Sequence, residues 1–167
     1  GVIILGSGAS VHDGLPWQAE LRSWLAPRMA GGLPTMGLCY GHQELAHILL
    51  GEVGFVFEDH HKLRGLRTVT LRPDRLWTDG AAGPLLVSHR EAVTRLPPEC
   101  VCLGRTEHVH VEAFAHVSLP IWGIQAHPEA TTAFVNNNDV PFEADAAALD
   151  HGHTLVDAFL HWVAEHS

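Results

Sequence analysis

The sequence predicts an α/β fold in three layers, with a mostly parallel central sheet and a small antiparallel extension. Three apolar runs, Val2–Leu5, Thr35–Leu38 and Ile121–Gln125, are typical of parallel strands that are buried on both faces. Segments with helical spacing of apolar residues follow the first and the second run. Strands that alternate with helices in this way indicate a layered α/β domain. We therefore expect residues 1–167 to form a single domain.

Three predicted helices complete this frame. The first is Pro16–Arg28, because Pro16 suits a first helical turn and apolar residues recur at helical intervals. Those apolar residues are Trp17, Leu21, Trp24 and Leu25. Gly41–Leu50 follows the second strand, and Thr154–Ala164 forms a closing helix with apolar residues on one side.

The middle of the chain has short β-like runs separated by Gly, Pro or Asp, and these predict the antiparallel extension. They are Val53–Phe57, Leu66–Leu71, Leu85–Val87, Val101–Leu103 and Val111–His116. A polar, weakly patterned segment from Asn136 to about Asp150 is interpreted as a surface excursion.

Composition excludes several classes of function. The formal charge is −9 and Lys62 is the one lysine among scattered arginines, so the clustered basic footprint of a nucleic-acid surface is missing. No apolar stretch approaches the roughly 18 residues of a membrane helix, and the opening GVIILG lacks the features of a signal peptide. The cysteines are odd in number (Cys39, Cys100, Cys102), and the last two share one face of a predicted strand. Reduced thiols in a cytoplasmic protein are expected.

The segment Gly37-Leu38-Cys39-Tyr40-Gly41 lies where the second strand meets a helix. A nucleophile between small residues at such a junction is the pattern of a nucleophile elbow, which holds the reactive side chain in a strained conformation above the sheet. N–H groups at the helix start stabilise a thiolate there, and the Tyr40 N–H can face a developing oxyanion. The alternative for Cys39 is a buried structural cysteine.

A cysteine nucleophile needs a base and a group that orients the base. Among fourteen histidines, His127 directly follows the third strand, at the sheet edge where active sites of open α/β sheets form. Pro128 keeps the His-Pro-Glu tripeptide extended, which lets Glu129 lie alongside the imidazole. The tripeptide alone is equally compatible with a surface turn. Together with the elbow it predicts a triad of Cys39, His127 and Glu129.

These two motifs resemble the class I (triad) glutamine amidotransferases. The resemblance rests on Gly-Leu-Cys-Tyr-Gly-His-Gln at 37–43 and Gly-Ile-Gln-Ala-His-Pro-Glu at 123–129, and it is closest to the amidotransferase domain of GMP synthase and its stand-alone homologues. Further ordered matches are Leu5–Ser10, Leu45-Ala46, Leu50–Gly54, Val87–His89, Leu96–Pro98 and Ala113-Phe114. The resemblance implies a flavodoxin-like fold with a strand and a helix before Val2. These are missing here, so either the sequence is incomplete at its start or the fold is trimmed at one edge.

The resemblance also implies a reaction. Cys39 would attack the side-chain amide of glutamine, giving a γ-glutamyl thioester and ammonia. His127 would protonate the departing amine and then activate water, with Glu129 orienting it. No cofactor takes part in this chemistry.

Further residues match the family's binding positions. The oxyanion hole would pair the Tyr40 amide with an amide of the glycine-rich loop, which consists of Gly6, Ser7 and Gly8. A plain tight turn is the alternative for this loop, and a phosphate cradle is disfavoured because the Lys-Ser/Thr ending is absent. Residues that match positions holding the substrate's α-amino and α-carboxylate groups are Gln43, Ser88 and His89.

The chain departs from the family pattern at three places. Arg90 stands where many members have glycine, so we expect it to contact an α-carboxylate or to alter what the site accepts. Ala126 replaces a common aromatic residue and is expected to loosen the packing behind the base. Ala130–Asp150 does not follow the short family ending and is a candidate lid.

Three functions remain open on the sequence. They are a glutaminase subunit that passes ammonia to a synthetase partner, a free-standing hydrolase of γ-glutamyl compounds, and a non-catalytic binding module, which an intact triad disfavours. No metal site is expected, because the histidine pairs lack a third ligand. Those pairs are His60-His61, His108 with His110, and His151 with His153. The tryptophans are expected in the core, with Trp77 the candidate for a partner surface.

Overall fold

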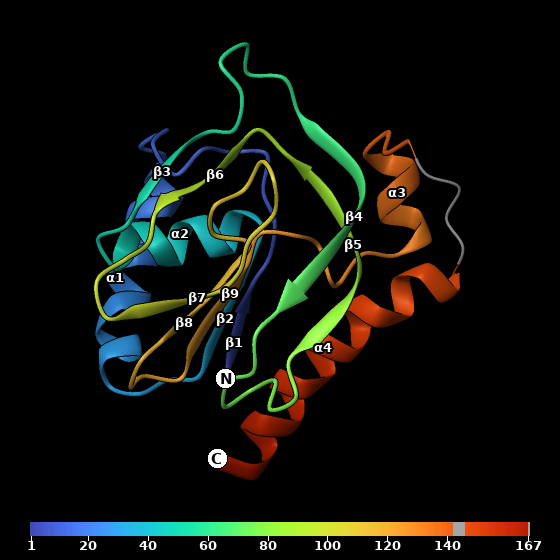
Figure 1. Ribbon diagram of the computed structural model, residues 1–167. Coiled ribbons are helices and arrows are strands. Elements are labelled where there is room, and N and C mark those ends of the chain that lie inside the picture. The colour runs from blue at the N-terminus through green and yellow to red at the C-terminus, as the bar shows by residue number, and fades with distance from the viewer. Residues whose placement is uncertain (142–145, 167) are drawn as a thin grey trace.

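The structure of the chain, a computed structural model, describes residues 1–141 and 146–166 (Figure 1). Its central sheet has five strands in the order β1-β2-β9-β8-β7. Their bounds are β1 Val2–Ile4, β2 Thr35–Leu38, β9 Ile121–Ile124, β8 Ala113–His116 and β7 Cys100–Gly104. β1, β2 and β9 run parallel, while β8 and β7 continue the sheet in antiparallel fashion.

Helices α1 (Pro16–Ala30) and α2 (Tyr40–Ile48) pack on one face of this sheet (Figure 1). The side chains that they share with the sheet in one core cluster include Leu25, Met29, Leu45, Phe114 and Ile121. The antiparallel pair of β3 (Glu52–Phe55) and β6 (Glu91–Arg95) adjoins α2 and forms a small sheet of its own. β6 was not predicted from the sequence.

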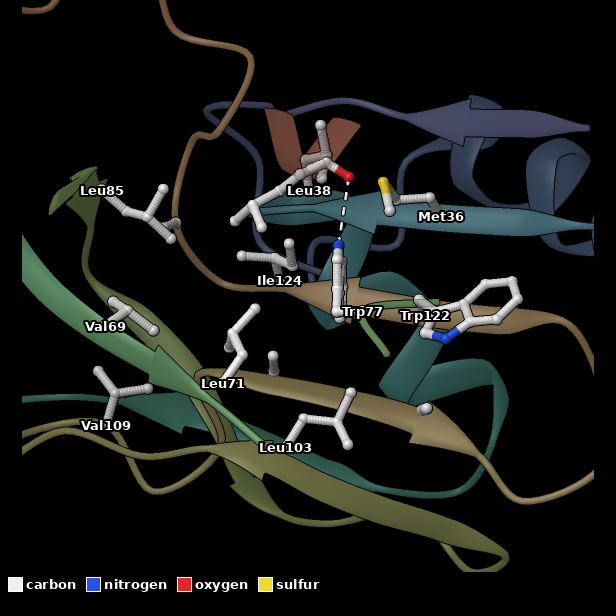
Figure 2. Close-up of a cluster of buried hydrophobic side chains, with 14 of the residues drawn as sticks. Met36, Leu38, Val69, Leu71, Trp77, Leu85, Leu103, Val109, Trp122 and Ile124 are labelled. Carbon is white, nitrogen blue, oxygen red and sulfur yellow. Dashed lines mark hydrogen bonds between the residues drawn. The ribbon is translucent and has the colours of Figure 1, made fainter. Parts of the chain in front are cut away.

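A hairpin and the last helix pack on the opposite face. β4 (Leu63–Leu71) pairs along its whole length with β5 (Ala81–His89), so both strands are longer than the predicted runs. α4 (Ala146–His166) lies beside β5 (Figure 1). The core between the sheet and the hairpin is drawn in Figure 2 and includes Met36, Leu38, Val69, Leu71, Leu85, Leu103, Trp122 and Ile124. The predicted three-layer α/β class is confirmed, with helices on one face and a hairpin and helix on the other.

The predicted apolar face of α1 is right at Leu25, which is buried, and wrong at its two tryptophans. Trp17 and Trp24 are 42% and 44% exposed, and the helix buries Gln18 and Met29 beside Leu25 instead. The Gln18 side chain is fully enclosed, and its Nε2 donates to the Tyr40 hydroxyl at 3.1 Å. Because a buried amide has to be hydrogen-bonded, this contact helps to fix which side of the helix turns inward.

Trp77 does not lie at a surface, in contrast to the prediction. Its side chain is 5% exposed and belongs to the core of Figure 2. The indole Nε1 donates to the Leu155 carbonyl at 3.4 Å, which ties the segment after β4 to α4. The polar tip of a buried tryptophan thus finds a backbone partner inside the protein.

The tail is more helical than predicted. α4 begins at Ala146 rather than Thr154, consistent with the strong helix propensity of the Ala146–Leu149 sequence, and a short helix α3 (Thr132–Asn137) precedes it. The Thr131 side chain caps α3 by accepting from the Phe134 N–H at 3.3 Å. Residues 142–145 of the predicted surface excursion lie outside the described residues. None of the helices in the described part of the chain is long and apolar enough to cross a membrane.

Candidate active site

Cys39 occupies the turn between β2 and α2 in a strained conformation. Its φ of 52° and ψ of −104° lie where side chains are rarely found, at a cost of about 1–3 kcal/mol. The Cys39 N–H donates to the Ile124 carbonyl at 2.9 Å, which anchors the turn to β9. A side chain at Gly37 would collide with the Gly41 carbonyl, and one at Gly41 would collide with the backbone of Ile4. The structure therefore has the geometry of a nucleophile elbow.

His127 follows β9, and its backbone is held by β5. Its N–H donates to the Leu86 carbonyl at 2.8 Å, and its own carbonyl accepts from the Ala130 N–H at 3.2 Å. The imidazole Nδ1 lies 2.9 Å from Glu129 Oε1, which leaves Nε2 to interact with the Cys39 sulfur. The three residues of the predicted triad are thus brought together.

The electrostatics of His127 favour its charged form. Burial opposes a charge on this side chain, which is 5% exposed, but the Cys39 sulfur and the Glu129 carboxylate outweigh burial and raise the pKa of His127 to about 10. The imidazole is therefore protonated at neutral pH. A protonated imidazole between a sulfur and a carboxylate is placed to donate its proton to a leaving group.

The loop after β1 packs directly on this pair. A Cβ atom at Gly6 would lie 2.7 Å from His127 Cε1 and 3.7 Å from Cys39 Cβ, so a larger residue there would displace the imidazole. Ser7 and Gly8 line the space around the Cys39 side chain. Tyr40 begins α2 directly after Cys39, and the first N–H groups of a helix have no intrahelical partner.

Two cavities meet at Cys39. The first has a volume of about 300 Å³, and we name it the binding cavity; its lining includes Gln43, Ser88, His89, Arg90 and Glu91. The second has a volume of about 350 Å³, and we name it the base cavity; its lining includes Gly6, His127, Glu129, Phe134 and Asn138. Both are lined by Ser7, Gly8, Cys39, Lys62 and Ser88. Cys39 thus borders a cavity on two sides.

The binding cavity gathers the residues predicted to hold the substrate's α-groups. Gln43 is 4% exposed, and its Nε2 donates to the Glu91 carbonyl at 2.7 Å. His89 Nδ1 donates to the same carbonyl at 2.9 Å. Arg90 also lines this cavity, and its side chain is exposed to solvent. The cavity is therefore lined by neutral polar groups from α2 and the end of β5, by the Arg90 cation and by the carboxylate residue Glu91.

Two buried polar atoms at the end of β5 have no hydrogen-bond partner among the described residues, namely Ser88 Oγ and His89 Nε2. Burial lowers the pKa of His89 to about 4, so its imidazole is neutral at pH 7. With its Nδ1–H given to Glu91, the Nε2 of His89 is an acceptor. A buried group left unpaired costs about 1–3 kcal/mol, which a bound ligand would offset.

Residues of the site that were not predicted from the sequence include Phe134, Lys62 and Gln125. The Phe134 ring packs on the His127 imidazole with centroids 4.4 Å apart. Lys62 lines both cavities. It is the single lysine of the sequence, which was the one feature that could have marked it as a site residue. Gln125 is fully buried with its Nε2 3.9 Å from Cys39 Sγ, and its place two residues before His127 was the signal there.

Within the described ranges, no group of three His, Cys, Asp or Glu side chains is arranged to hold a metal ion. The paired histidines make other contacts instead. His60 stacks on Phe55 with centroids 3.6 Å apart, and His61 stacks on Phe57 at 4.0 Å. His153 Nε2 bonds the Ala130 carbonyl at 2.9 Å, which joins α4 to the segment after His127.

The fold is a three-layer α/β sandwich with a strained cysteine on a strand–helix elbow. A histidine–carboxylate pair lies at the end of the neighbouring strand. These features place the chain in the class of α/β proteins built around a nucleophile elbow. Within this class, the chain belongs to the class-I glutamine amidotransferase family, whose model matches residues 1–138. The family predicted from the two motifs is confirmed.

Relatives and solved structures agree with this assignment. The chain is 34% identical over 132 residues to the glutamine-hydrolysing GMP synthase of Porphyromonas gingivalis, covering 77% of this chain and 24% of that protein. It is 33% identical over 109 residues to one subunit of the glutamine-hydrolysing GMP synthase of Pyrococcus furiosus, covering 58% of this chain and 51% of the relative. The chain thus spans about a quarter to a half of these relatives. A glutamine amidotransferase structure from Methylobacillus flagellatus shares the fold, with a TM-score of 0.71 at 21% identity over 95% of this chain and 74% of that chain.

Proposed function

We propose that this chain hydrolyses the side-chain amide of glutamine to glutamate and ammonia, with Cys39 as nucleophile. The observation that carries the proposal is the strained Cys39, which faces the His127–Glu129 pair between two cavities. His127 acts as acid and then as base, and Glu129 orients it and stabilises its charged form. Membership of the class-I family supports the same chemistry.

In the first half-reaction, the Cys39 thiolate attacks the amide carbon of glutamine. A carbon–sulfur bond forms and the carbon–nitrogen bond breaks, leaving a γ-glutamyl thioester. The proton held by His127 passes to the departing nitrogen, which leaves as ammonia. The pKa of His127, about 10, ensures that the imidazole holds this proton at neutral pH. A positioned acid of this kind contributes about 10²–10⁴ in rate.

In the second half-reaction, water attacks the thioester carbon from the base cavity. His127, now neutral, accepts a proton from this water, and the carbon–sulfur bond breaks to release glutamate and the Cys39 thiolate. The proton is again on His127, so the starting state is restored. Glu129 Oε1, 2.9 Å from His127 Nδ1, stabilises the imidazolium each time that it forms.

The negative oxygen of each tetrahedral intermediate needs hydrogen-bond donors. We assign this role to the Tyr40 N–H, at the start of α2, and to an amide of the Gly6-Ser7-Gly8 loop. The loop's position against His127 and Cys39 supports the assignment. Loss of one such donor costs about 10²–10³ in kcat.

The substrate's α-groups are assigned to the binding cavity, whose volume suits a small amino acid. The neutral His89 Nε2 is an acceptor for the α-ammonium group, and the Gln43 carbonyl oxygen is a second one. Ser88 Oγ and the exposed Arg90 guanidinium are donors for the α-carboxylate. The contacts to His89 Nε2 and Ser88 Oγ would satisfy buried atoms that have no partner among the described residues.

We further propose that the ammonia is delivered to a synthetase partner. The relatives include a separate GMP synthase subunit, and a synthase in which the matched segment is 24% of the length. In both, the matched segment is part of a larger chain or of a multi-subunit enzyme. Because the chemistry depends on a reduced Cys39, a cytoplasmic location is part of this proposal.

The test is labelling of the purified chain with a diazoketone analogue of glutamine, followed by peptide mass spectrometry. The adduct is expected on Cys39 and not on Cys100, whose thiol pKa is raised to about 12 by burial and by Glu99. Cys39→Ala is expected to remove both the adduct and hydrolysis. An adduct on Cys100 or Cys102, with Cys39 unmodified, would overturn the assignment.

Hydrolysis of γ-glutamyl peptides is the second candidate, because the base cavity offers room for a leaving group larger than ammonia. The two functions are separated by kcat/KM for glutamine and for a γ-glutamyl dipeptide on the chain without a partner. We expect slow hydrolysis of glutamine and still slower hydrolysis of the dipeptide. If the dipeptide is preferred tenfold or more, the peptidase function replaces the amidotransferase function.

A further inference from the structure

Two buried glutamine side chains connect the binding cavity to the back of Cys39. Gln43 lines the cavity, whereas Gln125 is fully buried and lines neither cavity. Gln43 Nε2 donates to Gln125 Oε1 at 3.3 Å, and Gln125 Nε2 donates to Cys39 Sγ at 3.9 Å. The two amides thus form one directional chain of hydrogen bonds that ends on the sulfur.

The orientation of both amides is fixed by their surroundings. Gln43 Nε2 also donates to the Glu91 carbonyl at 2.7 Å, so both of its hydrogens point into the protein and its oxygen is the end that a ligand can reach. The backbone N–H of Gln125 donates to the Glu112 carbonyl at 2.7 Å, which fixes the base of its side chain. A flip of either amide would leave a buried donor or acceptor unpaired.

We propose that Gln125 is a positioning residue that links occupation of the binding cavity to the state of the nucleophile. This inference rests on the proposed glutaminase function. When the substrate's α-ammonium binds the Gln43 oxygen, it polarises that amide and strengthens the bond from Gln43 Nε2 to Gln125 Oε1. The same effect passes to the bond from Gln125 Nε2 to Cys39 Sγ, which stabilises the thiolate.

A neutral amide suits this role. It favours the thiolate over the thiol without placing a second charge beside the protonated His127. It also stabilises sulfur as a leaving group when the thioester is hydrolysed, because the thiolate that departs regains a charge-assisted hydrogen bond. Gln125 therefore acts on both half-reactions without touching the substrate.

The test uses glutaramate, which is glutamine without its α-amino group, in a cycle with Gln125→Met. In the parent chain, loss of the α-amino group is expected to lower kcat about threefold to tenfold, as well as raising KM, since the bond from Gln125 to the thiolate is weakened but not lost. In Gln125→Met, the kcat values for glutamine and glutaramate are expected to differ by no more than about twofold. The ratio of their KM values is expected to stay as in the parent chain. An unchanged kcat ratio in Gln125→Met overturns the linkage.

A second measurement tests the contact to sulfur without any substrate. The alkylation rate of Cys39 by iodoacetamide is followed against pH by peptide mass spectrometry. Gln125→Met is expected to move the midpoint up by about half to one pH unit, equal to a threefold to tenfold loss of thiolate. If the parent chain hydrolyses neither glutamine nor glutaramate, the proposed function fails. If the alkylation midpoint of Gln125→Met equals that of the parent chain, the role of Gln125 is refuted.

Gln18→Met is the matched control. Gln18 is also fully buried, and its amide donates to the Ser10 carbonyl at 2.7 Å and to the Tyr40 hydroxyl at 3.1 Å. Its replacement is expected to lower the thermal midpoint, while the kcat ratio and the alkylation midpoint stay as in the parent. If Gln18→Met reproduces both effects of Gln125→Met, general loosening of the fold explains them and the proposal is withdrawn.

Discussion

On the side of Cys39 that holds His127, the polar groups are nearly all paired within the protein. The His127 N–H bonds Leu86, its Nδ1 bonds Glu129, and Phe134 covers its ring. On the side of the binding cavity, Ser88 Oγ and His89 Nε2 are buried and lack partners among the described residues. One oxygen of Glu129 is the exception on the first side. The difference supports the proposal that the reacting groups are preset by the sheet, whereas the binding groups are completed by the ligand.

The two histidines on these sides show the same contrast in their pKa values. Both are buried, at 5% and 4% exposure for His127 and His89. The Cys39 sulfur and the Glu129 carboxylate overcome burial and raise the pKa of His127 to about 10, whereas burial lowers the pKa of His89 to about 4. One imidazole is thus suited to carry a proton and the other to accept a hydrogen bond.

The largest expected effect is on the preset side. His127→Ala is expected to lower kcat by about 10³-fold or more, because residues of a triad act as a unit. Glu129→Ala is expected to cost less, since His127 retains its backbone contacts to Leu86 and Ala130. The measurement is steady-state glutamine hydrolysis. A kcat for His127→Ala within tenfold of the parent would contradict the triad.

On the binding side, His89 is expected to make the protein labile to acid. Its folded pKa, about 4, lies below its unfolded value of about 6.5, so the imidazole is mostly neutral in both states at pH 7. Below pH 6.5 the unfolded state takes up a proton that the folded state refuses. The free energy of unfolding therefore falls as pH drops toward 4, by about 3 kcal/mol at most from this residue.

The control for this effect is His89→Gln, which keeps a polar group but does not titrate. Denaturant unfolding of both chains from pH 7 to pH 4 gives the difference curve, in which other titrating groups largely cancel. The parent is expected to lose stability relative to the variant over this range. A flat difference curve would show that His89 is protonated in the folded state, and the contrast with His127 would be lost.

The sequence predicted the frame of this site better than its surroundings. Thr35–Leu38 and the small residues around Cys39 are local patterns, so the strand and the turn followed from them, and the fold class and family are confirmed. The roles of the site residues remain predictions. The exposed face of α1 was not predictable from spacing, because the amide of Gln18 is buried through contacts with Ser10 and Tyr40. Tertiary pairing overrode the apolar pattern there.

Phe134 was missed for a related reason. Its helix is only six residues long, and the contact of its ring with His127 depends on how the segment after β9 folds back. The unpaired state of His89 Nε2 was equally hidden, since it depends on tertiary packing that the sequence pattern does not reveal. Arg90, in contrast, was visible as a departure from the family pattern, and its position at the binding cavity allows a sharp test.

The smallest expected effect concerns Arg90, the exposed member of the binding side. If its guanidinium holds the α-carboxylate, Arg90→Gly is expected to raise KM about tenfold to a hundredfold, the range of a charge-assisted hydrogen bond, with little change in kcat. Because the contact is the same in the ground state and the transition state, binding suffers and chemistry does not. Arg105→Gly, which alters an exposed arginine outside both cavities, is the control and should leave KM unchanged. An unchanged KM in Arg90→Gly would mean that Ser88 and the buried groups alone hold the α-carboxylate. The groups that the ligand pairs with would then all lie in the interior of the binding cavity.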